Sequence, residues 1–322
     1  MPDIISLGEA LVDFVSTVSG VSVKDAPAFE KAPGGAPANV AAGLAKLGVS
    51  VGFAGKVGQD AFGLCLKETL EHWGVDTHGL ILDSACRTTL AFVSLTADGQ
   101  PSFAFYRNPG ADMMLTPDEI DPEWIGTAKI LHFGSISLLD APARDATRTA
   151  IAQARRGGAL ISYDPNLRPA LWSDRQSAFS FIREGMEQAE IVKMSEEELI
   201  EIQCASDTRQ GMEQLMKQGK IAVFVTRGAE GCCVRCAEGF AEQPAMKVDP
   251  IDTTGAGDGF VAGVLSRVLQ SLKEGSDPHR LPLDWWRETA RFANTVAGLS
   301  IGSKGAIPAL PTLEQVQRAL GQ

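Results

Sequence analysis

The 322-residue sequence predicts an α/β fold, in which helices cover a mostly parallel central sheet and a small β-sheet is attached at one side. Short β-branched runs alternate with longer segments of helical periodicity, which is typical of a parallel sheet covered on both faces. Two stretches break this alternation and carry strand and turn signals without helices. The sequence contains no internal repeat or low-complexity tract, so we expect one compact unit over residues 1–322 rather than two independent domains.

The central strands are expected where short apolar runs are bounded by polar or glycine-containing segments. They are Ile4–Leu7, Val51–Gly55, Ile130–Phe133, Leu160–Tyr163, Ile191–Met194 and Ile221–Thr226. Helices are expected where apolar residues recur at helical spacing between these runs. They are Pro37–Leu47, Ala61–Trp73, Ala141–Arg156 and Asp174–Gln188. This order of elements predicts parallel strands joined by helical crossovers.

A small β-sheet, the lid, is predicted from two separate segments. Thr88–Arg107 contains two strand-like runs that meet at Asp98-Gly99, and both turn residues tolerate the positive φ of a tight hairpin. The stretch Leu11–Val18 and the passage that follows it are expected to supply further strands. Because they contain no helix of their own, residues 11–33 and 88–110 are expected to project from the main body as a β lid.

The charge of the chain excludes some classes of partner. The formal net charge is −11 and the pI is near 4.9, whereas nucleic acids and anionic membranes are bound by positive surfaces. We therefore expect small-molecule ligands, no nucleic acid and no membrane. The N-terminus lacks the basic and apolar segments of a signal peptide, and no apolar run approaches the roughly 20 residues that span a bilayer. A cytoplasmic location is expected.

Three of the six cysteines lie close together, at positions 232, 233 and 236. Cys233 and Cys236 have the spacing of a metal-binding pair, but the sequence offers no second pair or nearby histidine to complete a tetrahedral site. Because the flanking residues have strand character, we interpret the group as reduced thiols of a strand.

The turn Asp252-Thr-Thr-Gly-Ala-Gly-Asp258 carries the clearest chemical signal, because it runs directly into an apolar helix. Its small residues let backbone N–H groups converge at the helix N-terminus, where the helix dipole adds positive potential. The predicted anion hole consists of Gly255, Ala256 and Gly257.

Asp258 lies in the first turn of this helix, where a carboxylate is electrostatically favoured, so we expect its pKa to stay low. Its position alone supports two interpretations. It is either a first-turn acid with no chemical role, or a base that accepts a proton from a hydroxyl attacking phosphorus at the anion hole. A weak base is sufficient when the proton leaves late in a loose transition state.

A second glycine turn, Gly34-Gly35-Ala-Pro-Ala-Asn39, opens another helix. Such a turn is weak evidence of function by itself. The Asn39 amide in the first helical turn makes a functional role more credible, because it can bond sugar hydroxyls while the glycines permit close approach of the backbone to the sugar.

Together the segments 34–48 and 252–263 resemble, in order and separation, the two signatures of the ribokinase-like (PfkB) carbohydrate kinases. Within this family the chain is most similar to the fructokinases. Three segments carry that similarity, Phe105-Tyr-Arg-Asn-Pro-Gly-Ala-Asp-Met113, Tyr163-Asp-Pro-Asn-Leu-Arg-Pro-Ala-Leu-Trp172 and Lys304-Gly-Ala-Ile-Pro-Ala-Leu-Pro311. The resemblance covers essentially the whole chain. It implies a three-layer α/β/α sandwich with a β lid that closes over the sugar.

The resemblance also implies a reaction, the transfer of the γ-phosphate of ATP to the 6-hydroxyl of D-fructose. Asp258 matches the family's catalytic base, and residues 255–257 match its hole for the transferring phosphoryl group. The positions implied for the sugar or its phosphate are Asp13, Gly34, Gly35, Asn39, Arg107 and Arg168.

Further positions are implied for the nucleotide and for cations. Thr226-Arg-Gly-Ala-Glu-Gly231 resembles the ATP-contacting turn, and Lys193-Met-Ser-Glu-Glu-Glu198 replaces the family's Asn-x-x-Glu segment, with a serine in place of the asparagine. The implied nucleotide-binding residues are Lys193, Ser195, Thr226, Gly228, Gly231 and Asn294. The implied metal-binding residues are Glu198 for Mg²⁺, and Asp252, Thr254, Ser300, Ser303 and Gly305 for a monovalent cation, K⁺.

Some alternatives remain open. The chain has neither a P-loop nor a dinucleotide fingerprint, so other nucleotide enzymes are disfavoured. A non-catalytic sugar-binding protein on the same fold is a second class, disfavoured by the intact Gly-Ala-Gly before Asp258. Among kinases, 2-keto-3-deoxygluconate kinase shares the Asp-Pro-Asn-Leu-Arg stretch and the lid arginine. Some relatives form homodimers through the lid, and a homodimer is an open possibility here.

Overall fold

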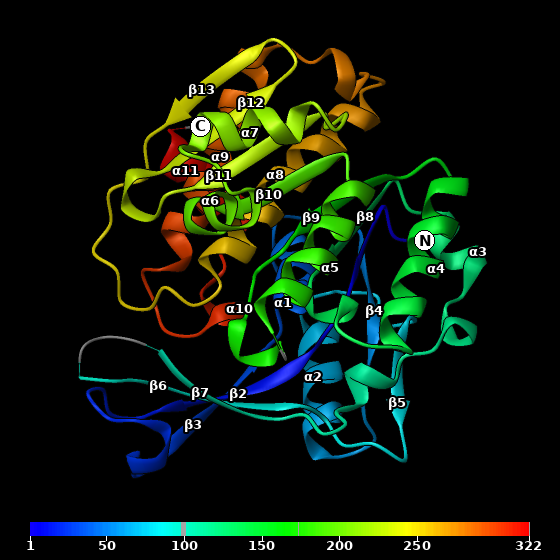
Figure 1. Ribbon diagram of the computed structural model, residues 1–322, viewed down its shortest axis with the longest axis vertical. Helices are drawn as coiled ribbons and strands as arrows, with labels where there is room; N and C mark the ends of the chain where they lie inside the picture. The colour runs from blue at the N-terminus through cyan, green and yellow to red at the C-terminus, as the bar shows by residue number, and fades with distance from the viewer. Residues whose placement is uncertain (98–100, 173, 322) are drawn as a thin grey trace.

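A computed structural model describes residues 1–97, 101–172 and 174–321 (Figure 1). A nine-stranded sheet forms its centre, in the order β13-β12-β11-β10-β9-β8-β1-β4-β5. Its strands are β1 (Ile4–Leu7), β4 (Val51–Gly58), β5 (Leu80–Asp83), β8 (Ile130–Gly134), β9 (Leu160–Asp164), β10 (Ile191–Ser195), β11 (Ala222–Thr226), β12 (Cys232–Cys236) and β13 (Gly239–Gln243). The pairs from β5 to β11 are parallel, and β12 and β13 extend one edge in antiparallel fashion.

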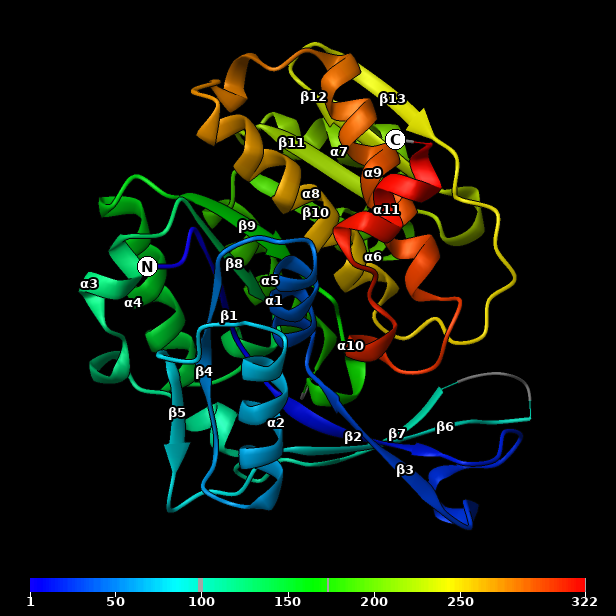
Figure 2. The same cartoon turned by 180° about the vertical axis from the view of Figure 1, so that it is seen from behind.

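Helices cover both faces of this sheet, as Figures 1 and 2 show from opposite sides. One face carries α1 (Ala36–Lys46), α2 (Ala61–His72), α8 (Ala256–Lys273), α9 (Leu283–Ser300), α10 (Ala306–Ala309) and α11 (Leu313–Leu320). The other carries α3 (Pro122–Gly126), α4 (Ala143–Arg156), α5 (Arg175–Gln188), α6 (Glu196–Gln203) and α7 (Thr208–Met216). A separate apolar cluster fills each interface. The expected three-layer α/β/α arrangement is confirmed.

The expected strands and helices are present, with boundaries that differ by a few residues at most. For example, the helix expected over Asp174–Gln188 begins at Arg175, because Asp174 is its N-cap and accepts a hydrogen bond from the Ser177 backbone N–H. The strands β5, β12 and β13 complete the edges of the sheet.

The small sheet has four strands in the order β3-β2-β6-β7. They are β2 (Leu11–Ser16), β3 (Phe29–Gly34), β6 (Leu90–Leu95) and β7 (Pro101–Tyr106). The two predicted segments therefore do form one sheet, in which β2 and β6 pair in parallel and the outer pairs are antiparallel. The turn expected at Asp98-Gly99 lies outside the described residues. In both views the small sheet extends away from the layers, below α10 (Figure 1).

Cys232, Cys233 and Cys236 are buried free thiols on β12. Within the described ranges, no group of three or more His, Cys, Asp or Glu side chains is placed to hold a metal ion. The interpretation of these cysteines as strand thiols agrees with both observations. In the same part of the chain, no helix is long and apolar enough to cross a bilayer.

Candidate active site

The candidate site lies at the carboxyl edge of the main sheet. Asp164, Ser195 and Thr226 are the last residues of the adjacent strands β9, β10 and β11. Parallel strands end at a common edge, so these side chains are presented together. The small sheet leaves the main sheet at the same edge, because only residues 8–10 separate β1 from β2.

Helices α1 and α8 bring the two glycine-rich segments into contact. They pack closely because Gly43 has no side chain; a Cβ there would lie 2.9 Å from the Cβ of Ala262. The first turns of the two helices therefore meet. Asn39 Nδ2 donates a hydrogen bond to Asp258 Oδ2 at 2.8 Å.

Asp258 is 6% exposed, and burial raises its pKa from 3.8 to about 6. The Asn39 hydrogen bond opposes this rise, Asp164 adds to it, and the cations Lys193 and Arg168 oppose it. The expectation of a low pKa is therefore wrong, because desolvation of the enclosed carboxylate outweighs the helix dipole. With a pKa of about 6, the group is still mostly ionised at pH 7.

The residues predicted to form the anion hole, 255–257, lie at the start of α8. Gly255 is the N-cap residue with φ +78°, a conformation that favours glycine. The Lys193 ammonium lies beside it, since a Cβ on Gly257 would lie 2.9 Å from Lys193 Nζ. Lys193 also forms an ion pair with Asp164 at 2.9 Å. Burial lowers the pKa of Lys193, but nearby carboxylates led by Asp164 outweigh burial and raise it, so the side chain stays cationic.

Glu198 lies next to this pair. Its two oxygens accept the backbone N–H groups of Leu167, at 2.6 Å, and Ser195, at 2.8 Å, the second as part of a capping box on α6. Burial raises the pKa of Glu198, and the nearby Asp164 raises it further. Two carboxylates held so close favour a cation between or beside them, and oxygen donors of this kind suit Mg²⁺. These two carboxylates, beside the Lys193 cation, fit a magnesium ion that nucleotide phosphates would also hold.

Asp13 approaches Asp258 from the small sheet. The bare backbone of Gly34 makes room for it, because a Cβ there would lie 2.2 Å from Asp13 Oδ2. Gly35 follows with φ +102° and opens α1. Burial raises the pKa of Asp13 to about 7, while Arg168 lowers it and Asp258 raises it. The residues expected to bind the sugar, Asp13, Gly34, Gly35 and Asn39, thus lie close to one another and to Asp258.

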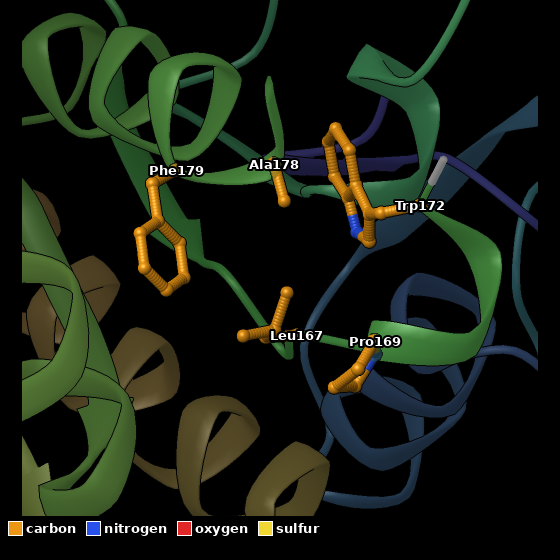
Figure 3. Close-up of a pocket in the computed structure, with 5 residues that line it drawn as sticks. All are labelled: Leu167, Pro169, Trp172, Ala178 and Phe179. Carbon is orange, nitrogen blue, oxygen red and sulfur yellow. The ribbon is translucent and has the colours of Figure 1, made fainter. Parts of the chain in front are cut away.

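Arg168 is presented by a tight turn after β9. Asn166, with φ +44°, accepts a hydrogen bond from Arg168 Nη1 at 2.6 Å. Leu167 and Pro169, which flank the arginine, line an apolar pocket of about 130 Å³ together with three residues from the following segment (Figure 3). The others are Trp172, Ala178 and Phe179. This pocket contains none of the expected site residues.

Arg107 is not part of the Asp13, Asp258 and Arg168 group in this structure. Its Nε donates to Asp112 Oδ2 at 2.7 Å, and both side chains are almost fully buried. The arginine therefore faces the base of the small sheet, where Asp112 neutralises its charge.

The expected nucleotide residues line the strand ends next to the anion hole. Thr226 ends β11 and its Oγ1 donates to the Met194 carbonyl at 3.4 Å. Gly228 and Gly231 both adopt positive φ in the turn that follows. Asn294 is directed elsewhere, because its Nδ2 donates to the carbonyls of Gln243 and Pro244 and so anchors the loop after β13.

The expected cation residues are only partly gathered. Asp252 accepts hydrogen bonds from the Thr254 backbone and hydroxyl and from the Gly305 N–H, which joins three of the five positions. The Ser300 hydroxyl instead donates to the Ala297 carbonyl within α9. Ser303 is exposed on the connecting loop.

Two site residues escaped the sequence analysis. Asp164 was noted only as part of the stretch before Arg168, yet it is the ion-pair partner of Lys193. Phe105 lies in register with Ala91 and hence with Asp13, so it shares the face of the small sheet that carries Asp13. The alternation of Phe103 and Phe105 along β7, continued by Arg107 just after it, was the available signal.

Comparisons with known proteins show the family of the chain. The model of the pfkB family of carbohydrate kinases matches residues 1–313. The chain is 46% identical over 321 residues to a probable chloroplastic fructokinase-6 from Arabidopsis thaliana, covering 99% of this chain and 82% of the relative.

Two solved structures are also similar over almost their whole length. A fructokinase from Xylella fastidiosa with bound ATP is 33% identical, with a TM-score of 0.90 and coverage of 100% of this chain and 99% of that one. A fructokinase double mutant from Vibrio cholerae, bound to fructose, ADP and a potassium ion, is 33% identical, with a TM-score of 0.88 and coverage of 99% and 98%.

Proposed function

Since this chain belongs to the pfkB family of carbohydrate kinases, we propose that it is a fructokinase that transfers the γ-phosphate of ATP to the 6-hydroxyl of D-fructose. The observation that carries the proposal is the position of Asp258. A buried carboxylate, oriented by Asn39, lies in the first turn of α8, beside an anion hole faced by the Lys193 ammonium. This geometry suits attack of a hydroxyl on a phosphoryl group.

In this mechanism Asp258 is the base. Asn39 occupies its Oδ2, which leaves Oδ1 to accept the proton of the attacking hydroxyl. With a pKa raised by burial to about 6, the carboxylate is ionised at neutral pH and more basic than an exposed aspartate. Backbone N–H groups of residues 255–257 and Lys193 receive the transferring phosphoryl group, whose negative charge they stabilise.

Cations complete the proposed site. Mg²⁺, when bound, neutralises charge on the nucleotide phosphates, and Glu198 and Asp164 are the residues that would hold it. K⁺ would be held near Asp252, whose hydrogen bonds to Thr254 and Gly305 support the turn before the anion hole. We further propose that Thr226, Gly228 and Gly231 contact ATP, and that the small sheet closes over the sugar and excludes water.

The local charge favours a neutral sugar over an acidic one. Arg107 is already paired with Asp112. Arg168 faces the two carboxyl groups of Asp13 and Asp258, as its effect on both of their pKa values indicates. A substrate carboxylate would meet these acids rather than a free arginine, so we propose D-fructose in preference to 2-keto-3-deoxygluconate.

A coupled assay of ADP release across D-fructose, D-ribose, 2-keto-3-deoxygluconate, D-tagatose and adenosine tests the proposal. We expect the highest kcat/KM with D-fructose. A clear preference for 2-keto-3-deoxygluconate would overturn the substrate and leave the kinase mechanism standing. If every acceptor fails while fructose still binds, the chain is a sugar-binding protein on a kinase fold.

The expected cytoplasmic location is also a proposal, because one of the relatives described above is a chloroplastic protein. Fractionation of cells that express the tagged full chain would decide the compartment.

A further inference from the structure

Glu9 is a buried acid that the mechanism above does not use. It lies in the link of residues 8–10, where the chain leaves the central strand β1 and enters the small sheet at β2. Only 3% of its surface is exposed. Charged residues are rarely buried to this extent unless they are paired, so its contacts need an explanation.

One side of Glu9 supports the sugar-binding turn. Its Oε1 accepts a hydrogen bond from the Ala36 backbone N–H, at the N-terminus of α1, at 3.2 Å. Its own backbone carbonyl packs against Gly35, where an added Cβ would lie 2.4 Å from the Glu9 oxygen. Any displacement of Glu9 would therefore move the Gly34-Gly35 turn and, through α1, the Asn39 amide.

The other oxygen of Glu9 is unsatisfied. Within the described part of the chain, Glu9 Oε2 is buried and has no hydrogen-bond partner. Burial raises the pKa of Glu9 to about 7, Asp112 contributes to this rise, and Arg107 opposes it. The charged groups that face Glu9 are therefore Arg107 and Asp112 at the base of the small sheet, together with the positive end of α1. Leaving a carboxylate oxygen unpaired in such surroundings is costly.

Arg107 has hydrogen-bonding capacity to spare. Its Nε is used by Asp112, which is also held by the Thr89 hydroxyl. Among the residues that the structure describes, Asp112 is its hydrogen-bond partner, so the two terminal nitrogens of the guanidinium are available. A guanidinium can serve two carboxylates at once, because its five N–H groups point outward in one plane.

We propose that Glu9 is a positioning residue that couples the small sheet to the sugar-binding turn. When the small sheet closes over the sugar, a terminal N–H of Arg107 donates to Glu9 Oε2 while Nε keeps Asp112. Glu9 then bridges Arg107 on one side and the Ala36 N–H on the other. Closure of the small sheet would thereby fix the position of the Gly34-Gly35 turn. The inference rests on the proposed kinase function and adds a residue that touches neither sugar nor nucleotide.

A double-mutant cycle with Glu9→Gln and Arg107→Lys tests the contact. Glutamine retains an oxygen for the Ala36 N–H. Lysine retains the charge but lacks the planar guanidinium that lets Arg107 hold Asp112 through Nε and reach Glu9 through a terminal nitrogen. Each single variant is expected to raise the KM for fructose about tenfold, as loss of one charge-assisted hydrogen bond implies. The kcat should change by less than about threefold, and the KM for ATP should stay unchanged. The double variant should be little worse than either single variant, because both remove the same bond.

Asp3→Asn is the matched control, since Asp3 forms carboxylate pairs with Lys129 and Lys273 at the opposite end of β1 from Glu9. It should lower thermal stability without changing the KM for fructose. Additive effects of the two test variants, or a wild-type KM for either, would overturn the proposal. If Glu9→Gln does not fold, Glu9→Asp takes its place in the cycle with Arg107→Lys. Wild-type turnover is measured first with every acceptor of the kinase assay. The double-mutant cycle then uses the acceptor with the highest kcat/KM. A result that rules out fructose as the substrate is thereby kept apart from a result that rules out the Glu9 contact.

Discussion

Replacement of Asp258 by asparagine should abolish most activity and at the same time stabilise the protein. The substitution keeps the shape of the side chain and an oxygen that can accept the Asn39 hydrogen bond. It removes the negative charge, and with it the base. If Asp258 acts mainly in the transition state, kcat should fall by about 10²- to 10⁴-fold while the KM for the sugar changes far less.

The gain in stability follows from the pKa. Because the pKa of Asp258 is raised from 3.8 to about 6, the folded state holds the proton more tightly than the unfolded state. Stability is therefore lost as pH rises from about 4 to 6, and above pH 6 the ionised group costs about 3 kcal/mol, at about 1.4 kcal/mol for each pH unit. The weaker neutral hydrogen bond to Asn39 offsets about 1 kcal/mol of this. A net gain of about 2 kcal/mol is expected at pH 8, and roughly half or less at pH 5.

Urea unfolding of both proteins at pH 8 and pH 5, together with steady-state kinetics, measures these effects. Asp121→Asn is a suitable control, because hydrogen bonds, above all the one with His78, lower the pKa of Asp121. Removal of this carboxylate should therefore destabilise the protein at pH 8, the opposite of the effect expected at Asp258. A variant of Asp258 with near wild-type kcat would refute its role as the base. A variant that is less stable than wild type at pH 8 would refute the argument from burial.

Two further predictions concern the frame of the site. Gly43→Val should lower the free energy of unfolding by about 1–3 kcal/mol and also reduce kcat, because the new side chain meets Ala262 and separates α1 from α8. Gly126→Ala is the control, since the added methyl group enters open space and should change neither the free energy of unfolding nor kcat. Urea titrations and steady-state kinetics measure both quantities. Exchange of a large organic cation for K⁺ at fixed ionic strength should raise activity in wild type but not in Asp252→Asn, and equal rates in both cations would remove K⁺ from the mechanism.

The sequence was sufficient to predict the layers and to single out the two glycine turns that the structure brings together. Parallel strands are buried on both faces and so appear as short apolar runs, which is why β1, β8 and β10 were found within a residue or so. The glycine turns before α1 and α8 were informative for a related reason. Glycine adopts the positive φ seen at Gly35 and Gly255 without strain, so a Gly-Gly or Gly-Ala-Gly turn before a helix can be recognised in the sequence.

What depends on three-dimensional surroundings could not be predicted. The raised pKa of Asp258 results from enclosure by segments far apart in the chain, whereas its helix position alone suggested a low value. In the same way, the pairing of Arg107 with Asp112 depends on a turn that brings two nearby residues face to face. The parallel pairing of β2 with β6 was also not predicted, because the two strands lie far apart in the sequence and nothing in either strand specifies its partner or register.

The placement of β1 in the middle of the main sheet has a consequence for how the chain acquires its structure during synthesis. Ile4–Leu7 leaves the ribosome shortly before its neighbour β4 but long before its other neighbour, β8, which ends only at Gly134. At about 5–20 residues per second, one edge of this apolar strand waits for several seconds without its partner. The open apolar stretch is only the four residues of β1, and the hairpin of β2 and β3 follows it directly in the chain. A nascent chain with so short an open edge offers little template for pairing with a neighbouring chain.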